Sequence, residues 1–272
     1  MDKSDLLYFQ KVAERIAKSA GELILTFRGK TLKTKSKTNA LDIVTEADLA
    51  SEAFILKEIH KEFPDHDFLS EESGAGGSRS PFRWIIDPID GTREFASGMP
   101  LFAVLLGLEY NGETIVNSVS MPVMQELYSC AKGLGTSLNG RSIRVSQQTQ
   151  LKESMVYVHP PKYSMAEPAF QSIWRMMSRI ARSTYRLQAG SYDMYYLSWI
   201  ARGAWEGFIL PVNYPKWWDV GTCMLLVQEA GGKVTTFMGN PVTEENYKKE
   251  GILATNGKIH DQLLAIIQKE GI

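Results

Sequence analysis

The sequence is poor in the features that mark several large classes of protein. Its 272 residues include only two cysteines, Cys130 and Cys223, too few for a disulfide framework or a cysteine-rich metal site. Both stand among apolar residues, so we expect buried thiols. No apolar run approaches the roughly 18 residues of a membrane-spanning helix, and residues 1–5 lack the charge order of a signal peptide. We therefore expect a cytoplasmic protein with no membrane partner.

Charge of either sign is not in excess. Lys and Arg number 30 and Asp and Glu 31, so the formal net charge is −1. This balance, without a strip of basic and aromatic residues, argues against a nucleic-acid partner. The one basic run, Lys30 to Lys37, fits a solvated connector or a single lysine near an anionic site. A hydrophobic content of 44% predicts a globular chain with a sizeable core.

Several catalytic signatures are missing as well. No G-x-S-x-G, no Walker A loop and no G-x-G-x-x-G occurs, so neither a serine nucleophile elbow nor a nucleotide-phosphate loop is indicated. The four histidines stand in unrelated contexts, which disfavours a zinc site or a histidine nucleophile; they are His60, His66, His159 and His260.

Two helices are indicated near the start of the chain. Apolar residues at helical spacing predict a helix from Leu6 to Phe27, with Ser4 as its N-cap and Gly29 as its stop. A second helix is predicted from Glu46 to Glu62, capped by Thr45 and ended before the next proline.

The rest of the chain alternates short elements. Strands are predicted at 84–86, 101–110, 113–120, 126–131 and 141–146, with a hairpin signal at Asn111-Gly112. Strands at 155–158, 184–187, 207–210, 233–237 and 252–254 then alternate with helices at 167–180, 191–202, 218–230 and 258–268. We expect sheets layered with helices. The Gly- and Ser-rich stretch 73–80 predicts a mobile loop.

One hexapeptide, residues 87–92 (DPIDGT), holds most of the functional information. Two carboxylates three positions apart, Asp87 and Asp90, follow an apolar strand, and Gly91 permits a tight turn with amides open to an anion. Acidic groups at a strand end beside such a turn can hold Mg²⁺ against a phosphate. An ordinary Asp-Gly turn is the alternative.

Further acidic clusters lie at the edges of predicted elements: Asp42 with Asp48, Glu71 with Glu72, and Asp219. Each has a simpler explanation, such as a carboxylate in the first turn of a helix or a solvated loop. If they converge, their repulsion requires bound cations. Oxygen donors without histidine or cysteine select Mg²⁺, Mn²⁺ or Ca²⁺, and Mg²⁺-assisted hydrolysis by an activated water is the interpretation that remains.

The ordered motifs resemble the inositol monophosphatase family. They are the segments 42–48 (DIVTEAD), 70–73 (SEES), 84–92 (WIIDPIDGT), Gly190-Ser191, Trp218-Asp219 and 229–232 (EAGG). The resemblance implies an α/β (α+β) fold, a layered α-β-α-β-α sandwich of the inositol monophosphatase and fructose-1,6-bisphosphatase type. It also implies one unit over 1–272, with a metal and water side at about 1–150 and a substrate side at 151–272.

The resemblance further implies a metal site and a route to an activated water. Two to three Mg²⁺ would be held by Glu71, Asp87, the carbonyl of Ile89, Asp90 and Asp219. Asp48 and Thr92 would orient and deprotonate the attacking water, and Glu71 would also act in catalysis. Supporting residues would be Lys37, Asp42 and Glu72. The implied enzyme is a lithium-sensitive phosphatase, commonly a homodimer.

The substrate side matches the family less well. Gly91 and Thr92 amides, Gly190 and Ser191 would contact phosphate or substrate, together with Lys216. Members that act on inositol phosphate carry a glutamate where this chain has Leu210, and a leucine accepts no hydroxyl hydrogen bond; a register shift would offer Glu206 instead. Inositol-1-phosphate is the default substrate, with histidinol phosphate and 3′-phosphoadenosine 5′-phosphate as alternatives. A metal- or ligand-binding protein without turnover is the alternative of another class.

Overall fold

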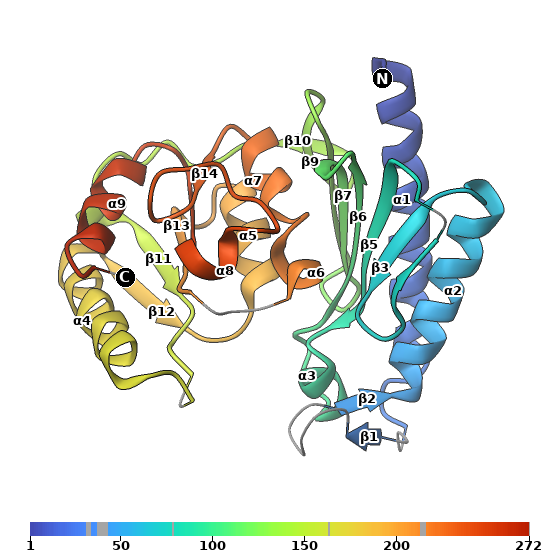
Figure 1. Cartoon of the computed structure of the whole chain (residues 1–272), viewed down its shortest axis with the longest axis horizontal. Helices are drawn as coiled ribbons and strands as arrows, with labels where there is room; N and C mark the ends of the chain where they lie inside the picture. Colours follow the sequence, from blue (N-terminus) through green and yellow to red (C-terminus); the bar gives the residue numbers. More distant parts are fainter. Residues whose placement is uncertain (31–33, 37–42, 78, 163, 213–215, 272) are drawn as a thin grey trace. The chain divides into compact units, whose positions relative to one another are not determined.

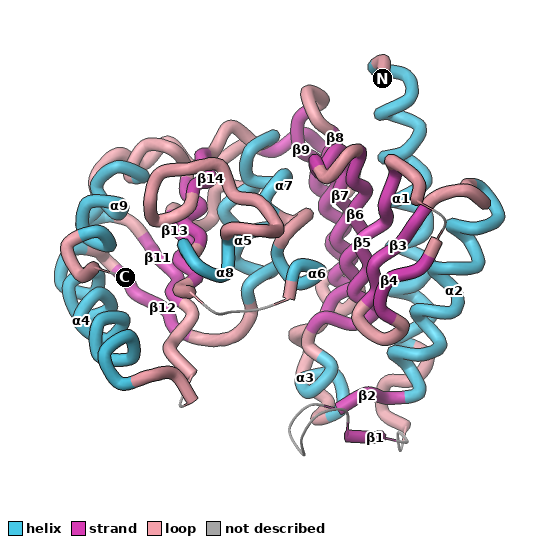
Figure 2. Tube along the Cα trace, viewed as in Figure 1, coloured by secondary structure: helices cyan, strands magenta, loops and turns pink. Residues whose placement is uncertain are grey.

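The computed structural model describes residues 1–30, 34–36, 43–77, 79–162, 164–212 and 216–271. The chain divides into two compact units, Met1–Arg141 and Ser142–Ile272. Each unit is built from a β-sheet with helices packed against it (Figure 2). None of the helices in the described ranges combines the length and the apolarity needed to cross a membrane.

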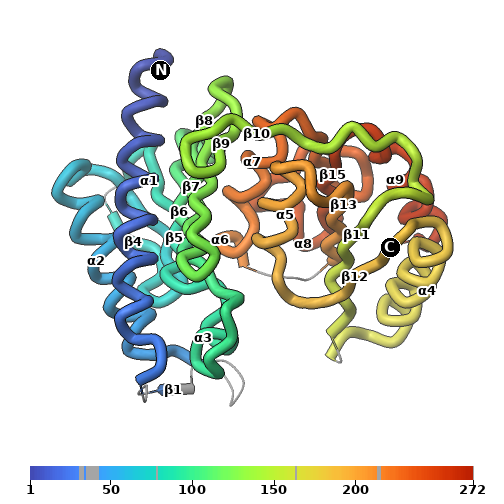
Figure 3. The backbone as a smooth tube through the Cα atoms, turned by 180° about the vertical axis from the view of Figure 1, so that it is seen from behind, coloured from blue at the N-terminus to red at the C-terminus, as the bar shows by residue number. Residues whose placement is uncertain are grey.

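The first unit is organised around an eight-stranded sheet in the order β10-β9-β8-β7-β6-β5-β3-β4. Its strands are β3 Asp67–Ser70, β4 Gly74–Gly76, β5 Phe82–Asp90, β6 Ala103–Tyr110, β7 Glu113–Met121, β8 Glu126–Ala131, β9 Gly135–Leu138 and β10 Arg141–Ile143. Helices α1 (Lys3–Leu25) and α2 (Glu46–Glu62) cover one face of this sheet (Figures 1 and 3). A short helix, α3 (Thr92–Ala96), follows β5, and a small two-stranded sheet pairs β1 (Thr34–Ser36) with β2 (Ile43–Thr45).

Helix α1 follows the predicted apolar stripe but begins earlier than predicted. Its N-cap is Asp2, whose carboxylate accepts from the N–H groups of Ser4 (2.7 Å) and Asp5 (3.0 Å), while Asp5 accepts from the N–H of Asp2 (3.0 Å). The predicted cap, Ser4, is wrong because a reciprocal capping box needs an acceptor three residues on, and Leu7 provides none. The helix ends at Leu25, short of the predicted Phe27.

The second helix and the central hairpin are confirmed. Helix α2 spans Glu46–Glu62 with Thr45 as its N-cap. Asn111 and Gly112 both have positive φ, 50° and 78°, as a tight turn between antiparallel strands requires. The predicted loop at 73–80 is partly wrong, because Gly74–Gly76 forms strand β4 against β3. Gly76 lies directly opposite Phe68, and a Cβ on that glycine would stand 2.3 Å from the ring, so a larger residue there would require the Phe68 ring to move.

The second unit contains a five-stranded sheet in the order β12-β11-β13-β15-β14. Its strands are β11 Met155–Val158, β12 Arg186–Ala189, β13 Gly207–Leu210, β14 Lys233–Thr235 and β15 Ile252–Thr255. Strand β11 is parallel to both β12 and β13, and β15 is antiparallel to β13 and β14. Helices α4 (Glu167–Ser183) and α9 (His260–Gln268) cover one face, and α5 (Asp193–Ala201) and α7 (Met224–Glu229) the other (Figure 1). The remaining short helices are the 3₁₀ turn η1 (Leu151–Glu153), α6 (Trp217–Val220) and α8 (Tyr247–Glu250).

The long helix predicted at 218–230 is two helices, α6 and α7. At the start of α7 the N–H groups of Leu225 and Leu226 bond three residues back, to the carbonyls of Thr222 (3.2 Å) and Cys223 (3.1 Å) in the connection between the two helices. Bonds of this spacing tighten the backbone and interrupt the α-helical ladder. The apolar period continues through the interruption, so periodicity alone does not reveal it.

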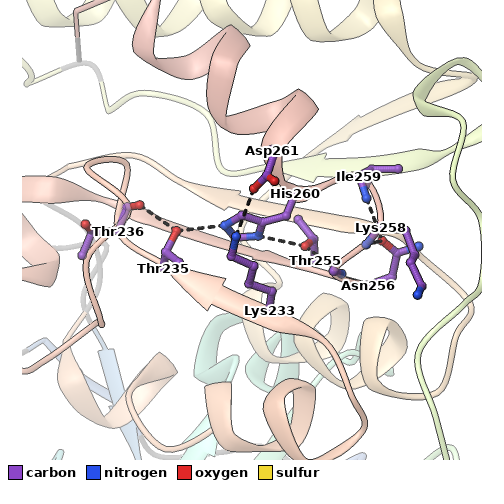
Figure 4. Close-up of polar contacts among 10 residues, drawn as sticks. Lys233, Thr235, Thr236, Thr255, Asn256, Lys258, Ile259, His260 and Asp261 are labelled. Carbon is purple, nitrogen blue, oxygen red and sulfur yellow. Dashed lines mark hydrogen bonds and ion pairs between the residues drawn. The ribbon is translucent and has the colours of Figure 1, made fainter.

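His260, one of the four histidines that the sequence assigns to no metal or catalytic site, is a core residue of this unit. His260 is fully buried, with Nε2 2.9 Å from the Thr235 hydroxyl and Nδ1 2.9 Å from the Thr255 hydroxyl (Figure 4). Burial, followed by the nearby charge of Lys233, lowers the pKa of His260 to about 4. The neutral ring therefore joins β14, β15 and the start of α9.

The core of the first unit can be tested at α1. Ile16 is fully buried in the cluster that includes Trp84, and Ile16→Ala should lower the free energy of unfolding by about 2–5 kcal/mol because it leaves a cavity. Leu7→Ala is the control on the same helix, since Leu7 is 43% exposed and its loss should change stability by about 0.5 kcal/mol or less. Urea denaturation measures both. Equal effects would contradict the packing of α1 on the sheet.

Candidate active site

Strand β5 carries a bulge between its two aspartates. Asp87 pairs with Leu105 on β6 and Asp90 with Ala103, so β5 contains one residue more than its partner. Pro88 suits this position because it needs no ladder partner for a backbone N–H, and its carbonyl accepts from the Ser51 hydroxyl at 2.9 Å. The bulge brings a carboxylate oxygen of Asp87 within 4.8 Å of one of Asp90. The predicted pair therefore does converge.

The turn after the bulge depends on glycine. Gly91 has φ 86°, and a Cβ there would lie 2.7 Å from the carbonyl oxygen of Leu101. Helix α3 starts immediately after, and its first bond runs from the Phe95 N–H to the Gly91 carbonyl at 2.9 Å. The hydroxyl of Thr92 is thereby placed beside the bulge, 3.0 Å from the carbonyl oxygen of Ile89.

Asp48 meets Thr92 from the other side, as the sequence predicted. Its Oδ2 accepts from the backbone N–H (2.8 Å) and hydroxyl (2.5 Å) of Thr45, closing the capping box of α2. Its Oδ1 accepts from the Thr92 hydroxyl at 2.9 Å. The simpler explanation, a carboxylate in the first turn of a helix, is therefore confirmed for one oxygen, while the other oxygen is bonded to Thr92; the catalytic role of Asp48 stays a prediction.

The surroundings of Asp48 favour its role as a base. The side chain is fully buried, and this burial raises the pKa of the carboxyl above its ordinary 3.8, with the charge of Glu71 adding to the rise. Hydrogen bonds from Thr45 and Thr92 act in the opposite direction. A carboxylate whose pKa lies closer to neutrality accepts a proton more readily at physiological pH.

Glu71 and Glu72 lie in the segment that follows β3, and the N–H of Glu71 bonds to the carbonyl of Ile86 at 3.2 Å. Sequence reasoning missed the residue that orders this segment. Glu52, 7% exposed, accepts from the Ser70 hydroxyl and from the N–H and hydroxyl of Ser73, both at 3.1 Å. The available signal was the spacing, since Glu52 follows Asp48 by four positions and lies on the same face of α2.

The donors around the bulge fit a hard cation. Asp87 is 1% exposed and Asp90 is half-buried, and two carboxylates at this separation repel each other in a partly desolvated site. The carbonyl oxygen of Ile89 lies 3.0 Å from the Thr92 hydroxyl, but that hydroxyl has one hydrogen and donates it to Asp48, so the carbonyl keeps a lone pair for a cation. Carboxylate and carbonyl oxygens are the ligands that Mg²⁺ prefers. The residues present therefore suit a magnesium ion.

The second unit holds the other predicted site residues. Asp219 lies in α6, where its Oδ2 accepts from the backbone N–H of Lys216 at 2.7 Å. Its negative charge, after burial, is the second cause that raises the pKa of Tyr247. The ammonium of Lys216 lies 5.9 Å from the centre of the Trp218 ring. Gly190 and Ser191 form the connection between β12 and α5.

Leu210 and Glu206 are the two candidate residues for the substrate-contacting position at the end of β13, and the structure places them at opposite ends of the strand. Leu210 is the last residue of β13, 1% exposed, and offers no polar side-chain atom. Glu206 precedes the strand, and its Oε2 accepts from the N–H of Met155 at 2.7 Å, at the start of β11. The register shift that would place Glu206 at the end of β13 is therefore wrong. Contacts of Leu210 with a substrate stay a prediction, and Lys37 and Asp42 lie outside the described residues.

Known proteins resemble the chain along its whole length. The model of the "Inositol monophosphatase family" matches residues 5–271. The "Fructose-1,6-bisphosphatase/inositol-1-monophosphatase" of Aquifex aeolicus is 34% identical over 267 residues, 97% of each chain. The "Nus factor SuhB" of Pseudomonas aeruginosa is 32% identical over 94% of each chain. The crystal structure of the extragenic suppressor protein suhB from Bartonella henselae superposes with a TM-score of 0.87 at 29% identity, covering 97% of this chain and 100% of that one. That structure and this chain share the layered α/β fold.

The role of Glu52 can be tested without an activity assay. Glu52→Ala should lower the free energy of unfolding by about 2 kcal/mol or more, because the hydroxyls of Ser70 and Ser73 lose a charged acceptor. It should also weaken Mg²⁺ binding about 10- to 100-fold, as loss of a residue supporting metal ligands does. Thermal denaturation and calorimetric titration measure the two effects. Lys57→Ala, on the exposed face of α2, is the control; an equal response of both variants would show that Glu52 orders nothing.

Proposed function

The chain belongs to the inositol monophosphatase family and is a phosphomonoester hydrolase, and on that premise we propose that it hydrolyses a small phosphomonoester with Mg²⁺, inositol-1-phosphate being the first candidate. The observation that supports this most directly is the buried Asp48 accepting from Thr92 beside the bulge of β5. The proposed base, Asp48, comes from the start of α2. The hydroxyl that would relay the proton and several of the proposed cation ligands come from one short stretch of backbone at the end of β5.

The proposed metal ligands are those named from the resemblance: Glu71, Asp87, the carbonyl of Ile89, Asp90 and Asp219. When bound, Mg²⁺ would supply neutralisation of the phosphate charge and a lowered pKa for water. The hard oxygen donors and the mutual repulsion of the carboxylates support this choice of cation.

The protein's own groups account for the proton movements. The Thr92 hydroxyl donates to Asp48, so its lone pair can accept a hydrogen from the attacking water. As the water oxygen bonds to phosphorus, its proton passes to Thr92 and the Thr92 proton passes to Asp48. The ester P–O bond breaks, and the departing alkoxide takes a proton from solvent. We further propose that the Gly91 and Thr92 amides hold the phosphate, where the positive φ of Gly91 leaves the backbone accessible.

The identity of the leaving group is the open part of the proposal. Leu210 ends β13 without a hydroxyl acceptor, whereas Lys216 and the Trp218 ring bring a cation and an aromatic face to the following segment. These groups suit a charged or aromatic leaving group, so histidinol phosphate and 3′-phosphoadenosine 5′-phosphate stay beside inositol-1-phosphate. The name of the Aquifex aeolicus relative adds fructose-1,6-bisphosphate.

A protein that binds metal and ligand without turnover is the second candidate. The Pseudomonas aeruginosa relative is named as a Nus factor, and its name states no phosphatase activity. The complete set of acidic residues in this chain favours turnover, because a silent protein has no need of Asp48 and Thr92 beside the metal ligands. From the family premise we also propose a cytoplasmic homodimer.

A substrate panel tests the function. Phosphate release should occur only with Mg²⁺, should stop with a chelator and with lithium, and should be well above the rest for one compound. The panel contains inositol-1-phosphate, histidinol phosphate, 3′-phosphoadenosine 5′-phosphate, fructose-1,6-bisphosphate and NADP. Absence of Mg²⁺-dependent release from all of them would contradict the proposal and favour the binding protein. Release that resists lithium would contradict only the expected lithium sensitivity.

Asp87→Asn tests the metal site. The amide keeps the shape of the side chain but removes a charge that two cations would share, so kcat should fall by at least about 100-fold, the loss seen when one electrostatic group at a reacting centre is removed. The melting temperature without metal should not fall, since one repelling charge is gone. Asp65→Asn, an isosteric change at an exposed position, is the control. An active Asp87→Asn enzyme would exclude the assigned site.

A further inference from the structure

Three parallel strands of the second unit end at the same edge of its sheet. Val158 of β11 pairs with Ala189 of β12 and with Ile209 of β13. The next residues, His159 and Gly190, therefore leave the sheet side by side, and the N–H of His159 bonds to the carbonyl of Ile209 at 3.0 Å. The carboxyl ends of parallel strands are where open α/β sheets bind their ligands. The segment 190–192, proposed above to contact substrate at Gly190 and Ser191, begins at this edge.

One hydroxyl holds both ends of this segment. The phenol oxygen of Tyr157 lies 2.6 Å from the carbonyl oxygen of Gly190 and 3.0 Å from the backbone nitrogen of Tyr192. The N–H of Tyr192 donates to it, and the hydroxyl's own hydrogen goes to Gly190 or to Asp193 Oδ1, 3.0 Å away. Three consecutive residues are thus bridged by a single buried side chain.

The ring that carries this hydroxyl has little freedom. Tyr157 is fully buried and stacks on Tyr196 of α5, with ring centres 3.9 Å apart and planes at 17°, and on Phe208 of β13 at 5.5 Å and 10°. Burial, ahead of the charge of Asp193, raises the pKa of Tyr157, so the phenol keeps its hydrogen. The donor and its direction are fixed by packing.

Asp193 is held in turn by a histidine. Nδ1 of His159 lies 2.9 Å from each carboxylate oxygen of Asp193, and because a carboxylate only accepts, Nδ1 carries the hydrogen. Both residues are 8% exposed. This bidentate contact joins the end of β11 to the first residue of α5, which directly follows the segment 190–192. Neither residue, nor Tyr157, belongs to the site indicated by the sequence motifs.

We propose that these three side chains, the Tyr157 network, position the segment 190–192 for substrate binding and thereby set the enzyme's affinity for its substrate. The inference rests on the proposed function, since it deepens the substrate contact that the resemblance implies for Gly190 and Ser191. The three act through the backbone of the segment and are positioning residues. They lie beside the end of β13, so this edge of the sheet has ordered polar groups although Leu210 itself has no polar side-chain atom.

Tyr157→Phe tests the network, because it keeps both stacking contacts and removes only the hydroxyl. With the best substrate of the panel, KM should rise about tenfold with kcat within about twofold, the pattern of a lost contact made equally in the ground and transition states. Amide exchange at Tyr192, measured by NMR, should accelerate about tenfold because its N–H loses its acceptor. Tyr128→Phe is the matched control, a fully buried tyrosine of the first unit whose hydroxyl donates to Glu126 at 2.9 Å.

A second pair of variants distinguishes positioning from packing, and remains informative if Tyr157→Phe folds poorly. Asp193→Asn keeps an acceptor oxygen of the same size and should stay closer to wild type in KM than Asp193→Ala. An unchanged KM in Tyr157→Phe and in Asp193→Ala, measured against an active wild type, would overturn the inference, even if Tyr192 exchanged faster. A wild-type enzyme inactive on the whole panel would overturn the proposed function instead, and that outcome is read before any variant is made.

Discussion

Repulsion between carboxylates at the bulged end of β5 is the constraint on which the candidate site depends. Asp87 and Asp90 present oxygens within 4.8 Å of each other, and the charge of Glu71 helps to raise the pKa of the buried Asp48. Hydrophobic surroundings strengthen such repulsion because they screen it poorly. The arrangement is stable only when each carboxylate has a designated hydrogen-bond donor or a cation. The elements around the bulge provide such donors.

The start of helix α2 supplies two of these donors, because the N–H and the hydroxyl of its N-cap, Thr45, both donate to Asp48. One turn later the Ser51 hydroxyl donates to the carbonyl of Pro88, and Glu52 accepts from Ser73 in the segment that carries Glu71. One face of one helix thus holds Asp48, the bulge and the segment of Glu71 in place. A rigid helix holds these groups more closely than loops would, and catalytic geometry requires such precision.

The second unit orders the segment 190–192, the segment that we propose binds substrate. Its three parallel strands bring His159, Gly190 and the end of β13 to one edge, and the stacked Tyr157 anchors the connection to α5. Parallel strands require crossover helices, here α4 and α5, so residues far apart in sequence become neighbours there.

The sequence by itself determined the local geometry of several turns and caps in the first unit. The hexapeptide 87–92, Thr45 before α2 and the Asn111-Gly112 turn act through neighbours a few residues away, where backbone geometry and capping preferences decide the structure. Tertiary structure alone decided that Glu52 supports the segment of Glu71, that Glu206 bonds to Met155, and that Tyr157, His159 and Asp193 meet. Each of these contacts joins residues between 18 and 51 positions apart in the sequence. Local patterns carry no information about such partners, because the pairing is set by which strands lie side by side in the sheet.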